Sequence, residues 1–113
     1  MQYMLMIYSS EAQVPTEAQA GEMMAAYGAY TEALKQAGAW VAGDRLRPSS
    51  ASTTVQVANG KTQVLNGPYA ETKEQLGGYY LIDVADLDVA ISWAARCPGA
   101  SHGKMEVRPI WTK

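Results

Sequence analysis

The run YMLMIY at residues 3–8 is apolar at nearly every position. Successive side chains of a strand point to opposite faces, so a strand with one wet face alternates apolar and polar residues. Here apolar side chains would fill both faces, which is typical of a strand covered on both sides. The run GGYYLID at residues 77–83 has the same property. The sequence therefore predicts two strands that each need a cover on both faces.

Two helices are predicted between and after these strands. Thr16 and Gln19 have the spacing of a capping box, and Gly38 is well placed to end the first helix. The expected buried stripe of this helix is Met23, Tyr27, Tyr30, Leu34 and Ala37. Asp86 can cap the second helix, and Cys97 follows it as buried filler. The buried stripe expected here is Leu87, Ala90, Ile91, Ala94 and Ala95.

The remaining segments read as strands and turns. Further strands are expected at residues 40–46, 52–58, 62–65 and 105–111, and Asn59-Gly60 is a strong hairpin signal. The order is that of an α+β, ferredoxin-like βαββαβ plan with an inserted hairpin. In that plan residues 3–8 and 77–83 form the central strands, while both helices cover one face. The simplest cover for the other face is a second copy, so we expect a homodimer that forms a dimeric α/β barrel.

Size and composition limit the classes of function. The 113 residues fit one domain, 1–113, and the net charge of −2 argues against a nucleic-acid partner. No apolar stretch approaches the ~20 residues that span a bilayer, and the start lacks the features of a signal peptide. A cytoplasmic protein is the expectation. With one histidine and one cysteine a zinc site is not expected, and no phosphate-binding glycine loop or other cofactor motif is present.

Several segments together carry a resemblance to a known family. They are the opening YMLMIY, AYGAYTEALKQAG at 26–38, AETKEQLGGYYLID at 70–83 and the closing MEVRPI at 105–110. Over essentially its whole length the chain resembles the YCII-related family, in its DGPF-domain branch. The resemblance implies a ferredoxin-like dimeric α/β barrel. It also implies genes that often lie near those of alternative sigma factors, and one relative in chloroaromatic degradation is an enzyme.

The chain departs from the family pattern at two places. The Asp-Gly-Pro-Phe motif of the branch is Asn66-Gly67-Pro68-Tyr69 here, and an asparagine cannot act as a general base. Other members carry a helix histidine paired with an acidic residue as a proposed acid/base site. The first predicted helix contains no histidine, so that pair cannot be transferred to this chain.

Two residues are candidates for catalysis. His102 is the only histidine and could exchange protons near neutral pH, but it could equally be a half-exposed loop residue. Asp44 is the preferred acidic candidate, since it lies near the end of a predicted strand beside Arg45.

The candidates for ligand binding fall in two places. Around the Gly67-Pro68 break, Asn66, Tyr69, Glu71 and Lys73, together with Glu74, form either a polar lip or a turn with a solvated surface. On the last strand, Arg108 and Glu106 point the same way. Arg108 could grip a carboxylate of a ligand, or the two could pair with each other.

The expected function is the binding or processing of a small polar or aromatic molecule, without a cofactor, by isomerase- or lyase-type proton chemistry. The alternatives are a non-catalytic sensor or accessory protein in a sigma-factor pathway, and a structural dimer with no ligand. The strands at 77–83 and 105–111 are taken as antiparallel, with their starts at opposite ends of the sheet. His102 and residues 66–73 are then expected to share a site only across a dimer.

Overall fold

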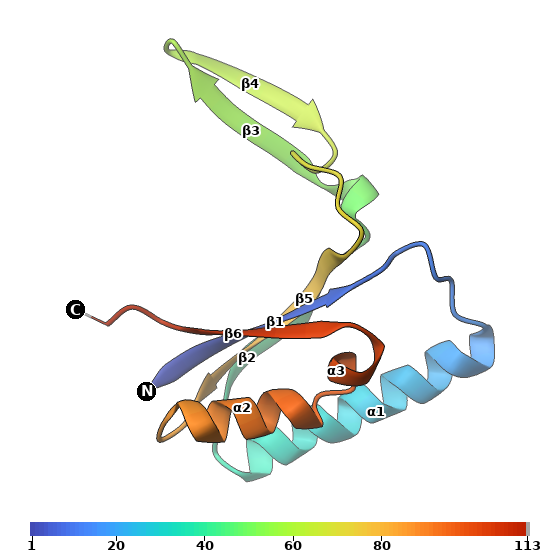
Figure 1. The fold of residues 1–113 in the computed structure, drawn as a ribbon, viewed down its shortest axis with the longest axis vertical. Helices are drawn as coiled ribbons and strands as arrows, with labels where there is room; N and C mark the ends of the chain where they lie inside the picture. Colours follow the sequence, from blue (N-terminus) through green and yellow to red (C-terminus); the bar gives the residue numbers. More distant parts are fainter. Residues whose placement is uncertain (113) are drawn as a thin grey trace.

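The computed structural model describes residues 1–112 and shows an α+β chain (Figure 1). Its elements are β1 (Gln2–Ser9), α1 (Glu17–Gln36), β2 (Trp40–Arg45), the short 3₁₀ helix η1 (Ser49–Ala51), β3 (Thr53–Ala58), β4 (Lys61–Asn66), β5 (Gln75–Asp83), α2 (Leu87–Arg96), α3 (Gly99–His102) and β6 (Lys104–Pro109). The predicted order of the six strands and the two long helices is confirmed, whereas η1 and α3 were not predicted. The last strand, however, ends at Pro109 rather than Trp111, whose side chain is 94% exposed.

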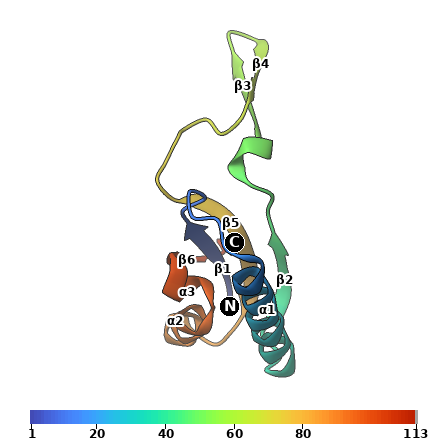
Figure 2. The same cartoon turned by 90° about the vertical axis from the view of Figure 1, so that its right-hand side faces the viewer.

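Four strands form the main sheet, in the order β2-β5-β1-β6, and every neighbouring pair is antiparallel. The two strands with apolar residues on both faces, β1 and β5, are the central ones, as predicted. Both long helices and α3 lie on one side of this sheet (Figures 1 and 2). The arrangement agrees with the ferredoxin-like plan.

The core lies between the sheet and the helices. Tyr3, Leu5 and Ile7 of β1 point toward the helices and are buried, as Tyr80 and Ile82 of β5 are. From α1, Tyr30 meets the rings of Tyr80 and Trp93 edge-on, at centroid distances of 5.1 and 6.0 Å. The Tyr30 hydroxyl donates a hydrogen bond of 2.7 Å to the carbonyl oxygen of Trp93, so burying this phenol leaves no polar atom unpaired. Cys97 is 1% exposed, which confirms it as buried filler.

The predicted buried stripe of α2 is confirmed at Ala90 and Ala94, but it is wrong at Leu87, Ile91 and Ala95, which are exposed. The buried residues are Ala90, Trp93 and Ala94, followed by Cys97. Leu87 and Ile91 are 47% and 49% exposed. Ala90, Trp93, Ala94 and Cys97 have the spacing of one helical face. This face turns toward the core because the large Trp93 ring packs there against Tyr30. In α1 the stripe ends at Leu34, since Ala37 is the exposed C-cap.

The predicted caps are present. The Thr16 side-chain oxygen accepts from the Gln19 amide at 3.2 Å, and the Gln19 side chain accepts from the Thr16 amide at 3.0 Å. Replacing Thr16 by Ala removes one acceptor from the start of α1 and should lower the free energy of unfolding by about 1 kcal/mol. Urea unfolding followed by circular dichroism at fixed protein concentration measures this loss. Thr16→Ser keeps the acceptor and serves as the control; an Ala variant as stable as wild type would contradict the cap.

A second, two-stranded sheet consists of β3 and β4 and stands away from the rest of the chain. We call residues 53–66 the hairpin arm. Its turn has positive φ at Asn59 (52°) and Gly60 (75°), as the Asn-Gly signal predicts. The arm projects on the side of the main sheet opposite the helices (Figures 1 and 2). The radius of gyration is accordingly 16.0 Å, whereas a compact domain of this length has about 13 Å.

Candidate functional site on the open face of the sheet

The face of the main sheet opposite the helices has no cover within residues 1–112, and we call it the open face. Because side chains alternate along each strand, the residues next to the buried ones point to this side. In the two central strands they are apolar or aromatic and only partly buried. The open face comprises Ala42 and Asp44 of β2, Tyr79 and Leu81 of β5, Met4, Met6 and Tyr8 of β1, and Lys104, Glu106 and Arg108 of β6.

The register places the polar residues of the open face at its two edges. One row across the four strands reads Asp44, Tyr79, Met6 and Glu106. The next row reads Ala42, Leu81, Met4 and Arg108. An apolar centre from β1 and β5 therefore lies between an acidic residue on β2 and charged residues on β6. Small-molecule sites have this composition, with apolar walls and a few polar groups that fix orientation.

Asp44 has a direct partner on this face. The Tyr79 hydroxyl donates a hydrogen bond of 2.8 Å to a carboxylate oxygen of Asp44. This hydrogen bond is the largest cause of a raised pKa for Tyr79, because it favours the protonated phenol. The pair therefore presents a phenol that keeps its proton, oriented by a carboxylate.

Removing the carboxylate should reverse the shift. In Asp44→Ala the pKa of Tyr79 should fall toward the ordinary value of a tyrosine, since both the acceptor and the negative charge are gone. Carbon NMR of ring-labelled tyrosine across an alkaline titration measures it, with Tyr79→Phe assigning the signal. Glu106→Gln, in the same row but on the opposite edge, is the control and should leave this pKa in place. A Tyr79 pKa that does not respond to loss of Asp44 would rule out the pair.

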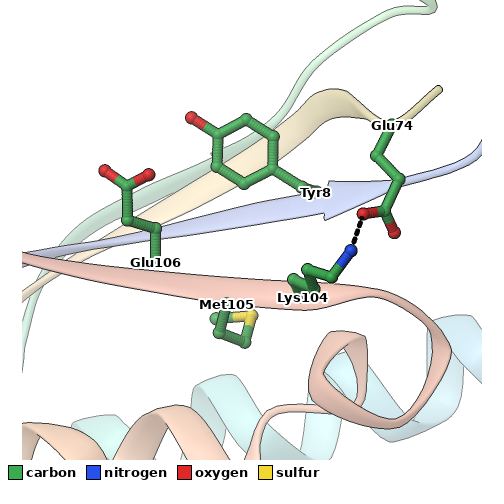
Figure 3. A pocket seen from close by; sticks show the side chains of 5 residues that line it. All are labelled: Tyr8, Glu74, Lys104, Met105 and Glu106. Atoms are coloured by element: carbon green, nitrogen blue, oxygen red, sulfur yellow. Dashed lines mark hydrogen bonds and ion pairs between the residues drawn. The ribbon is translucent and has the colours of Figure 1, made fainter. Parts of the chain in front are cut away.

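A depression of about 450 Å³ lies at the other edge of the open face (Figure 3). It is lined by Tyr8, Glu74, Lys104, Met105 and Glu106. The Lys104 ammonium and the Glu74 carboxylate form an ion pair of 2.6 Å across it. This pair joins the start of β6 to the loop that leads into β5.

The Lys104–Glu74 contact corrects an expectation about strand direction. Both β5 and β6 are antiparallel to β1, which lies between them, so they run the same way. Their starts are at the same end of the sheet, and the prediction of opposite ends was wrong. The argument that a shared site must be composite across a dimer is thereby removed.

The structure separates the predicted site residues into two groups. Asp44 and Arg108 lie on the open face, and Arg108 forms an ion pair with Glu106, the structural alternative that the sequence left open. Asn66 ends β4, and Tyr69, Glu71 and Lys73 are exposed in the loop that follows it. Tyr69 lies beside the hairpin arm, where it lines a second depression with residues of β3 and β4. The roles of these loop residues in ligand binding stay predictions.

His102 is the last residue of α3 and is exposed. It directly precedes Gly103 and β6, at the same end of the sheet as Glu74. Within residues 1–112 it has no hydrogen-bond or ion-pair partner that would position it. Its catalytic role is untested.

In the part of the chain that the structure describes, no three His, Cys, Asp or Glu side chains are grouped as metal ligands. The same residues include no helix with the length and apolar character needed to cross a bilayer.

Comparison with known proteins places the chain in a family. An uncharacterised protein of Rhizobium meliloti (strain 1021), R00369, is 50% identical over 68 residues. The match covers 58% of this chain and 55% of that protein, so the chain spans just over half the length of this relative. The YCII-related domain matches residues 1–112. The resemblance is confirmed at this level, and the chain belongs to the YCII-related domain family.

Proposed function

We propose that two copies of the chain pair through their open faces and bind a small polar or aromatic molecule in the cavity between them. The observation that carries this is the pattern of the open face, an apolar centre between two polar edges. A large apolar patch with a polar rim marks a site of interaction rather than ordinary surface. A pair of such faces forms the dimeric barrel that the family resemblance implies.

The chemistry that fits this face is cofactor-free proton transfer of the isomerase or lyase type. Tyr79 would turn its single O–H from Asp44 to a substrate oxygen on which charge develops, and the Asp44 carboxylate released by that turn would accept the proton that the substrate loses. In the single chain this pair is exposed to water. A second sheet over the open face would exclude water and so strengthen the electrostatic interactions of the pair.

A non-catalytic binder or sensor in a sigma-factor pathway is the second candidate. It is favoured by the ion pairs that Arg108 and Lys104 already form with Glu106 and Glu74 of the same chain. In addition, the buried residues within 1–112 include none that is charged. A ligand that is recovered unchanged after long incubation would favour this candidate over the enzyme.

NMR titration tests the proposal. Phenol, benzoate and 4-hydroxybenzoate each combine a ring for the apolar centre with a polar group for an edge. Adding them should shift the backbone amides of Met4, Met6, Tyr79 and Leu81. Met6→Trp should fill the cavity and abolish these shifts, whereas Leu87→Trp, on the exposed side of α2, should leave them. Shifts confined to the helix side, or no shifts with any probe, would contradict a ligand site on the open face.

A further inference from the structure

The chain exposes more surface than a compact monomer of its mass. Its accessible surface is 8156 Å², whereas a monomeric protein of 12.2 kDa exposes about 6,100 Å². The main sheet alone does not account for the excess of about 2,000 Å². The helices cover one of its faces, so only the other face adds exposed surface. The hairpin arm is the other uncovered part.

The valines of the hairpin arm are largely uncovered within residues 1–112. Val55, Val57 and Val64 are 60%, 66% and 63% exposed. Residues directly opposite each other in a strand pair point to the same face, so Val55 with Val64 and Val57 with Thr62 form one face. We call Val55, Val57, Thr62 and Val64 the valine face. An isolated two-stranded hairpin is marginally stable in water, so this ribbon needs a partner surface.

The position of the arm indicates which surface that is. The arm projects from the sheet on the side of the open face, away from the helices (Figures 1 and 2). A second copy seated on the open face would therefore lie beside the arm. We propose that the valine face packs against this second copy, so that the hairpin arm of each copy contacts the other copy. This inference rests on the pairing proposed above and adds the arm to it.

The chemistry of the arm favours a second copy over other partners. Lys61 is the only charged residue among residues 53–66, so the arm offers nothing to attract a nucleic acid or an anionic membrane. In a two-fold dimer both copies use the same surfaces. One such interface would therefore cover the arm and the open face of each copy. The excess area also agrees, because two copies carry an excess of about 4,000 Å² and obligate homodimers bury about 2,000–5,000 Å² in total.

The test compares two charge-matched variants. Val55→Glu with Val57→Glu places two charges on the valine face, and Gln56→Glu with Ala58→Glu places two charges on the other face of the same strand. Sedimentation velocity should show the dimer dissociation constant raised by about a hundredfold or more in the first variant, and by less than about threefold in the control. Circular dichroism checks that both variants fold.

Hydrogen exchange on the wild-type protein supplies a second measurement that needs no variant of the arm. Amides of residues 53–66 should be protected in the dimer and should exchange quickly in a monomeric Leu81→Arg protein. A dimer whose arm amides exchange quickly, and which both double variants leave equally intact, would overturn the role of the arm and leave the open-face pairing standing. A monomeric wild-type protein would overturn both proposals.

Discussion

Leu81→Arg is expected to convert the protein from a dimer into a folded monomer. Leu81 lies near the centre of the open face, between Ala42 of β2 and Met4 of β1. In a monomer the arginine side chain would be solvated, so the free energy of unfolding would change little. In the dimer it would bury an unpaired charge against the apolar centre of the partner's sheet, at a cost of about 4 kcal/mol or more, and so raise the dissociation constant about a thousandfold.

The control for this variant is Leu87→Arg. Leu87 is 47% exposed on α2, on the far side of the sheet, so the same replacement there should leave the dimer intact. Size-exclusion chromatography with light scattering over a range of concentrations gives the mass of each variant. If Leu81→Arg is as dimeric as Leu87→Arg, the open face is not the interface.

Gly103→Ala is expected to destabilise the protein by about 3 kcal/mol or more. A Cβ atom at this position would clash with the backbone oxygen of Tyr8. That oxygen belongs to β1, which is hydrogen-bonded to β5 on one side and to β6 on the other. It cannot move without disturbing the pairing of these strands. The change also displaces the start of β6, where Lys104 meets Glu74.

A second glycine variant serves as the control. Gly21 lies in the exposed part of α1, and a Cβ there would have no atom within 4 Å. Gly21→Ala should therefore stabilise the protein by about 1 kcal/mol, through helix propensity alone. Urea unfolding at a fixed protein concentration measures both. A Gly103→Ala protein as stable as wild type would show that the junction between α3 and β6 is not packed as described.

The parts of the fold that could be predicted from the sequence depend on local signals. The double-sided strands at 3–8 and 77–83, the Thr16–Gln19 capping box and the Asn59-Gly60 turn each lie within a few residues of chain. The phase of α2 depends instead on where Trp93 meets Tyr30, a contact between residues 63 positions apart. Periodicity cannot supply that contact, so Leu87 and Ile91 were wrongly placed in the core.

The candidate site could be predicted only in part. The sequence singles out Asp44 and Arg108 as candidates because charged residues in a strand are conspicuous, whereas it indicates Tyr79 only as part of an apolar face. Its pairing with Asp44 depends on a register shift between Trp40 and Ala42, which no local signal fixes. The Lys104–Glu74 pair likewise follows from the shared direction of β5 and β6.

The central claim is that a second copy covers the open face, and the mass of the wild-type protein in solution tests it most directly. Light scattering at micromolar concentration should give twice the chain mass of 12.2 kDa. This mass should persist on dilution until the dissociation constant is reached. A mass of 12.2 kDa at every concentration would contradict the account, because the apolar residues of β1 and β5 would then face water with no cover.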